Sequence, residues 1–192
     1  MVWAAACILL HSRRQWLLYY ICASFGLATF IVYGAIQADL HCALSGMEMD
    51  HTSRMLNWMG IASYVRETVL YIPTSSTWVV MECSLERSAL MEITVIACLL
   101  TFYVGFSFPR RFVSVIAGTI ATYCANILGM LTIAVILNRY GSGYEYFAHS
   151  VVARMIFFVF VLIIYWYLIT RPTIRIIHDS LEKIKQRSGD TQ

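Results

Sequence analysis

Charged side chains are scarce in this sequence of 192 residues. They make up 13% of the chain, while hydrophobic residues make up 59% and the mean hydropathy is +0.67. An average soluble domain is about 25% charged and about 45–50% apolar. The composition therefore excludes an ordinary soluble domain. It predicts an all-α fold, a polytopic helical integral membrane protein with four to six transmembrane helices in one domain over residues 1–192.

Several signatures of chemistry are also missing. There is no glycine-rich phosphate loop, GxSxG elbow, HExxH helix or pair of intramembrane aspartates, which argues against most ATPases, hydrolases and membrane metalloproteases. The six cysteines form no CxxC pair, and His41, Cys42 and His51 match no known metal spacing. No cofactor and no metal are therefore expected. The basic residues lack interleaved aromatics, so no nucleic-acid partner is expected.

Long hydrophobic windows are what the sequence has in abundance, and they predict where the chain crosses a bilayer. A short segment, Met1–Leu10, lacks the charged start and cleavage site of a removable signal peptide, which favours a short first span. The clearer spans are Trp16–Gln37, Ser88–Phe108, Phe112–Leu137 and Val151–Ile169.

Lysine and arginine are distributed unequally between alternate connecting segments. One set holds Arg13, Arg14, Arg110, Arg111, Arg171, Arg175, Lys183, Lys185 and Arg187, and the other holds Arg54, Arg66, Arg87 and Arg139. Because positive charge is retained inside, the first set is expected to be cytoplasmic, with a basic C-terminal tail at about 171–192. The protein is thus expected in the cell membrane, multi-pass, with residues 38–87 and 138–150 on the outer face. Cys83 and His149 would then share one membrane surface.

The long outer segment is expected to contain two kinds of structure. Arg54–Tyr71 mixes apolar and charged residues, which predicts an interfacial amphipathic helix, with a poor transmembrane span as the alternative. After Pro73, the run Thr74–Val80 is rich in threonine, serine and valine, which predicts an extended segment leading to Cys83.

Cys83 is the first candidate for chemistry. A thiolate needs a cation or a helix N-terminus to form near neutral pH. Arg87 follows one helical turn later, and a helix starting near Ser84 would direct its N-terminal dipole at the sulfur. The alternatives are an ordinary cysteine at a helix start, or one half of a Cys42–Cys83 disulfide.

The second candidate cluster opens the last span. His149 is expected at the interface, as a functional group or as a simple anchor, and Arg154 about 7 Å deeper. An arginine in an apolar span is costly unless it is paired or faces a polar cavity. Glu92, at a similar depth in another span, would offer an ion pair, and this structural role stands beside a catalytic one. A third feature, Asn126 with Gly129, is typical of close helix packing.

Three motifs in this order resemble the exosortase/archaeosortase family, most of all its short Gram-positive branch (XrtG-like). They are Glu82-Cys83-Ser84, Asn126-Ile127-Leu128, and Ala148-His149 followed by Arg154. The resemblance implies a membrane cysteine transpeptidase or protease that cleaves C-terminal sorting signals of exported proteins through a thioester at the outer membrane face. It implies catalytic roles for Cys83 as nucleophile, His149 as proton shuttle and Arg154 as the group that stabilises the oxyanion or thiolate. The implied partners are substrates with a hydrophobic C-terminal tail, membrane lipid, and a glycosyltransferase or glycolipid acceptor.

Two positions depart from the family pattern. Leu85 follows Ser84 where glycine or alanine is usual, and Gly129 stands where the family motif Asn-x-x-Arg has its arginine. Either Arg154 or Arg87 then supplies the guanidinium, or the chain is a weak or inactive member. The alternative function is a non-catalytic scaffold subunit of a glycosyltransferase or export system, and a small transporter comes third.

Overall fold

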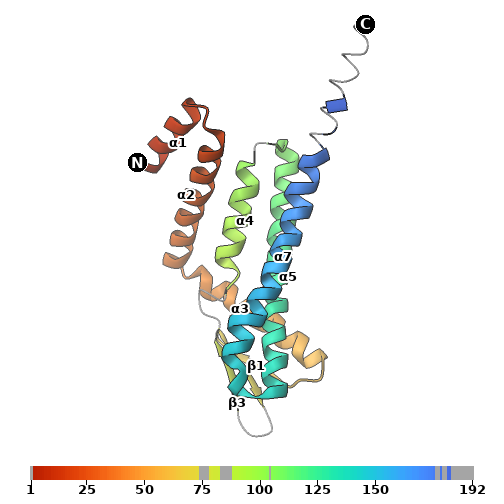
Figure 1. Cartoon of the computed structure of the whole chain (residues 1–192). Helices are drawn as coiled ribbons and strands as arrows, with labels where there is room; N and C mark the ends of the chain where they lie inside the picture. The colour runs from red at the N-terminus through yellow and green to blue at the C-terminus, as the bar shows by residue number, and fades with distance from the viewer. Residues whose placement is uncertain are drawn as a thin grey trace.

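The computed structural model describes residues 2–73, 78–82, 88–103, 105–175, 178 and 181–182 (Figure 1). The longer helices are α1 (Val2–Ser12), α2 (Trp16–Gln37), α3 (Leu40–Trp58), α4 (Leu90–Phe102), α5 (Phe108–Tyr140) and α7 (Arg154–Tyr165). Short helical turns connect them: η1 (Ser142–Tyr144), α6 (Glu145–Phe147), and the π-helical η2 (Ala148–Ala153) and η3 (Trp166–Thr170). A small sheet contains β1 (Tyr64–Arg66), β2 (Val69–Pro73) and β3 (Trp78–Glu82).

Three helical segments of the described chain are long and apolar enough to cross a membrane. They are α2, α5 and the continuous segment Ser150–Arg175, which contains α7. The predicted helical, polytopic membrane fold is confirmed, and α2 has the predicted bounds. The predicted span Met1–Leu10 corresponds to α1, which has 11 residues and is too short to cross the hydrocarbon by itself.

The predicted span Ser88–Phe108 is longer than the helix in the structure, which is Leu90–Phe102. Helix α4 has 13 residues, or about 20 Å of the roughly 30 Å of hydrocarbon. Tyr103 leaves the helix in an extended conformation, and α5 begins at Phe108 with a proline in its first turn. Arg111 Nε donates a hydrogen bond to the Phe106 carbonyl oxygen at 3.0 Å, which closes the turn between the two helices.

The connecting segments gather at two opposite ends of the molecule. Figure 1 shows the α1–α2 turn, the α4–α5 turn and the C-terminal end of the last helix at one end, and α3, the sheet and the α5–α7 connection at the other. The first end carries the arginine-rich turns, and the second carries the segments that charge asymmetry predicts to be outside. We call α3, the sheet and the part of α5 packed on them the outer layer, after the side on which the charge asymmetry predicts them.

Helix α3 and a β-hairpin replace the predicted interfacial helix Arg54–Tyr71, which is wrong. Helix α3 ends at Trp58, and Gly60 follows with φ +82°, a conformation that favours glycine and ends the helix. The Asn57 side chain then exchanges two hydrogen bonds of 3.0 Å with the backbone of Ser63, which fixes the turn into β1. The sheet has the order β1-β2-β3 and is antiparallel throughout.

The segment after Pro73 is extended where it is described. Residues 78–80, the end of the predicted extended run, begin β3, while 74–77 lie outside the described residues. Strand β3 alternates buried and exposed side chains, and Val79 and Met81 point into the core. In the register of β2 and β3, Leu70 pairs with Met81 and Ile72 with Val79.

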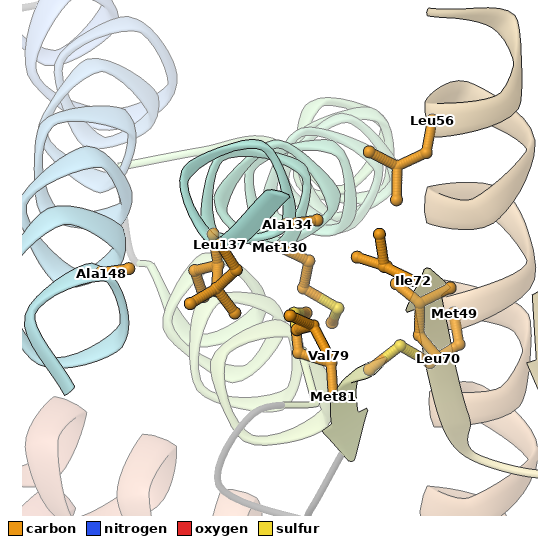
Figure 2. Packing of buried hydrophobic residues seen from close by; sticks show 11 residues of the cluster. Met49, Leu56, Leu70, Ile72, Val79, Met81, Met130, Ala134, Leu137 and Ala148 are labelled. Carbon is orange, nitrogen blue, oxygen red and sulfur yellow. The ribbon is translucent and has the colours of Figure 1, made fainter. Parts of the chain in front are cut away.

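The main hydrophobic core lies in the outer layer, between the sheet, α3 and α5 (Figure 2). Figure 2 shows side chains from all three converging on one volume, with Ala148 on the next helical segment beside Leu137. The buried members are Met49, Leu56, Leu70, Ile72, Val79, Met81, Met130, Ile133, Ala134, Leu137 and Ala148. By contrast, the helices toward the other end leave many large apolar side chains exposed, as lipid-facing helices do.

Candidate functional site

A cavity of about 560 Å³ lies where the outer layer meets the membrane helices. It is lined from α4 by Glu92, from α5 by Asn126 and Gly129, and from the start of α7 by Arg154. Most of the remaining wall is apolar and includes Met49, Met81, Met130, Phe157 and Phe158. Two opposite charges and one amide in an otherwise apolar cavity are typical of a binding or catalytic site.

One of the two glycines of α5, Gly129, leaves open space in this cavity. Gly129 is buried, yet a Cβ atom built on it would meet no atom within 4 Å. Gly118, about three turns earlier on the same helix, is different, because a Cβ there would lie 2.8 Å from Leu100 Cδ1. The close packing predicted for Asn126 with Gly129 is therefore wrong at Gly129, which leaves an open space. Gly118, which the sequence analysis did not single out, packs closely instead.

Glu92 and Arg154 lie on the wall of one cavity without an ion pair between them. Glu92 is in the first turn of α4, where the helix dipole favours a negative charge. Its Oε2 atom is shielded from solvent and accepts no hydrogen bond from the described part of the chain. Arg154 is exposed. The two predicted partners thus share the site, but the predicted pair is not formed.

His149 lies in η2, the π-helical segment that precedes Arg154. π-Helical turns are rare and occur often at functional sites. The residue before it, Ala148, is fully buried against the core, so η2 is fixed to the outer layer. The structure does not describe the His149 side chain.

Cys83 lies outside the described residues, but the chain on both sides of it is placed. Met81 lines the cavity and Glu82 ends β3, while Ser88 and Ala89 are buried before α4 begins. Of the three predicted site residues, Arg154 alone has a described side chain on the cavity wall. Cys42 is a free thiol, so the alternative of a Cys42–Cys83 disulfide is not realised.

Glu48 is a site-supporting residue that the sequence does not reveal. Its side chain is fully buried on α3, and its Oε1 atom accepts a hydrogen bond from the backbone N–H of Ala89 at 3.0 Å. The first N–H groups of a helix have no partner within the helix, so this carboxylate satisfies one of them at the start of α4. It also attaches the end of the segment that carries Cys83 to the outer layer.

A second polar contact joins α3 to α5. His51 Nδ1 lies 2.8 Å from the Met47 carbonyl oxygen and 2.9 Å from the Tyr123 hydroxyl. His51 is therefore engaged in packing. The ligand atoms of Asp39, His41 and Cys42 lie within 4.8 Å of one another at the start of α3. His51, which the sequence analysis considered together with His41 and Cys42, does not belong to this group.

Comparison with known proteins supplies a family. The profile of the family described as "Transmembrane exosortase (Exosortase_EpsH)" matches residues 1–167, which include Cys83, His149 and Arg154. No curated protein and no solved structure matches the chain. The family match covers α1 to α7, the sheet and every residue that lines the cavity. The chain therefore belongs to the transmembrane exosortase family.

Proposed function

We propose that the protein is a membrane cysteine transpeptidase or protease that cleaves C-terminal sorting signals of exported proteins at the outer membrane face. The observation that carries the proposal is the cavity, where the Arg154 guanidinium and the Asn126 amide share a wall with the open space at Gly129. Membership of the transmembrane exosortase family supports the same class of activity.

The neighbours of Cys83 along the chain support a place for its thiol near the cavity. Cys83 comes two residues after Met81, which lines the cavity, so its Cα atom is at most about 7 Å from that of Met81. On the other side, the bond between Glu48 and Ala89 holds the start of α4. The segment that carries the nucleophile is thus attached at both ends beside the cavity.

The reaction proceeds in two steps. The Cys83 thiolate attacks the scissile carbonyl carbon, and the oxygen that gains negative charge is stabilised by Arg154. The C–N bond breaks, His149 gives a proton to the leaving amine, and the acyl group remains on sulfur as a thioester. An acceptor amine or hydroxyl, or water, then attacks the thioester carbonyl, loses its proton to His149 and releases the thiolate.

The apolar part of the cavity suits the substrate. Phe157, Phe158 and Val161 belong to the last membrane-spanning segment, beside the charged groups. A hydrophobic C-terminal tail arriving through the lipid would contact these side chains while its polar start reaches Arg154. The basic turns at the far end of the helices support a cytoplasmic location for that end and an outer location for the site. The short Gram-positive branch remains the proposed subgroup.

Co-expression with an exported reporter that ends in a hydrophobic tail tests this proposal. Cys83→Ala should leave the amount of protein unchanged and abolish tail release. Cys124→Ala, which removes an exposed thiol on α5, is the matched control and should release the tail normally. His149→Ala should slow release without preventing alkylation of Cys83. Tail release by Cys83→Ala would contradict the proposal. Absence of release by every form would favour a scaffold subunit.

A further inference from the structure

We propose that the cavity contains a subsite for a cationic side chain, a lysine or arginine, of the protein that is processed, with Glu92 as its counter-ion. The inference rests on the proposed function for the identity of the ligand. Binding itself needs no turnover, so the subsite can be tested in a protein that lacks the nucleophile.

The Glu92 carboxyl group lacks a partner for one of its oxygen atoms, which supports the subsite. A carboxylate at this depth is unfavourable unless it is paired or hydrogen-bonded. Its Oε2 atom is shielded from solvent and has no hydrogen-bond partner among the described residues, and no ion pair joins it to Arg154. The cavity wall thus holds a carboxyl group with one buried oxygen that no described side chain pairs. An incoming cation would pair with this group and favour its ionised form.

The cavity also has room for a lysine or arginine side chain. Gly129 lines the same cavity and has nothing within 4 Å of the place where a Cβ atom would lie, in a total volume of about 560 Å³. A lysine or arginine has a long apolar stem and a charged head. The stem would contact Met130 and Phe158 on the wall, and the head would reach Glu92.

Glu92 and Arg154 are carried by different helices, which also supports the subsite. Glu92 belongs to the start of α4 and Arg154 to the start of α7, so different helices carry them. A peptide held between these helices can present its carbonyl oxygen to Arg154 and a cationic side chain to Glu92. Opposite charges on separate helices would therefore orient the substrate as well as bind it.

Peptide binding to full-length Cys83→Ala protein in lipid nanodiscs provides the test. The probes are synthetic peptides with a leucine-alanine tail and a polar segment before it. One lysine is moved through the polar segment, and each lysine peptide has a norleucine counterpart of similar length and no charge. We expect a position at which lysine binds about tenfold more tightly than norleucine, the size typical of a hydrogen bond to a charged group.

Two pairs of variants assign this preference to the subsite. Glu92→Gln keeps the shape and removes the charge, and it should abolish the preference for lysine, while Glu92→Asp should retain part of it. Gly129→Arg should also abolish it, because its own guanidinium would fill the space and pair with Glu92. Gly129→Ala is the control and should keep the preference. Thermal unfolding of each variant confirms that it is folded.

The subsite is wrong if lysine and norleucine bind equally at every position, or if Glu92→Gln keeps the preference. These results are independent of catalysis. A lysine preference in a protein that never releases a tail would retain the subsite and reject the proposed enzyme. Tail release without any lysine preference would do the reverse.

Discussion

The outer layer and the membrane helices are held together in different ways. In the outer layer, α3 and the sheet bury a shared apolar core against α5. Only 17% of the apolar window in α2 and 11% of that in Ser150–Arg175 is buried inside the protein, against 44% in α5. The outer layer is therefore stabilised by its own packing, whereas α2 and the last helix need lipid around them. Helix α5 belongs to both regions, and the cavity lies on it.

Polar groups differ between the two regions as well. Helix α3 buries Glu48 and Thr52, and the Thr52 hydroxyl donates to the Glu48 carbonyl oxygen at 2.8 Å. Ser53, also buried, lies 2.9 Å from the Ser63 hydroxyl across the turn into the sheet. These bonds fix the position of one layer, and thereby the two ends of the segment that carries Cys83. In the proposed enzyme, the membrane helices contribute the groups that face the substrate.

The largest expected effect is on the outer core. Leu56→Ala removes a fully buried side chain and should lower the free energy of unfolding by about 2–5 kcal/mol. Leu162→Ala makes the same chemical change on α7, where the side chain is 51% exposed, and should cost less than about 1 kcal/mol. Thermal or denaturant unfolding in detergent measures both. Equal losses would mean that the two regions do not differ in packing.

A smaller effect is expected from the carboxylate of α3. Glu48→Ala leaves the buried N–H of Ala89 without its acceptor, which should cost about 1–3 kcal/mol and slow tail release by displacing the start of α4. Asp50→Ala is the control on the same helix. Its ion pair with Arg54, at 3.2 Å, is exposed and should contribute about 0–1 kcal/mol. If Asp50→Ala costs as much as Glu48→Ala, the role given to Glu48 is wrong.

The smallest expected difference in the free energy of unfolding is between alanine substitutions at the two glycines of α5. Gly129→Ala adds a methyl group to open space and should stabilise the helix by about 0.5–1 kcal/mol. In Gly118→Ala the new methyl would meet Leu100, Ile96 and Leu168, and the repacking should remove this gain and cost about 1 kcal/mol. The free energy of unfolding of both variants, measured in the same detergent, tests this difference. A destabilised Gly129→Ala would show that the space beside Gly129 is occupied.

The membrane region follows from the sequence far better than the outer layer does. The bounds of α2 are predicted correctly, because a continuous apolar segment of this length is expected to cross the bilayer as one helix. The grouping of the connecting segments into two ends also follows, since arginines mark one end. Helix α3 is missed because four of its six buried residues are polar, and the hydrogen-bond partner of Glu48 lies 41 residues later in the chain. No local pattern encodes such a contact.

The candidate site is predicted in part for the same reason. Arg154 stands out because a cation inside an apolar span needs an explanation. The open space at Gly129, and the lack of a partner for Glu92 Oε2 among the described residues, depend on how α4, α5 and α7 pack, which no periodicity shows. The sequence marks Gly129 as part of a close-packing feature and as a departure from a family pattern. The structure adds what the departure does, which is to widen the cavity.

The central claim is that Cys83 is an activated thiol on the outer face of the membrane. The most direct measurement is the alkylation rate of Cys83 by a membrane-impermeant maleimide in intact cells, followed by intact mass, with exposed Cys42 as the internal reference. We predict that Cys83 reacts in intact cells and faster than Cys42, because the proposed site would stabilise its thiolate. Labelling of Cys83 only after lysis, or no faster than Cys42, would contradict it.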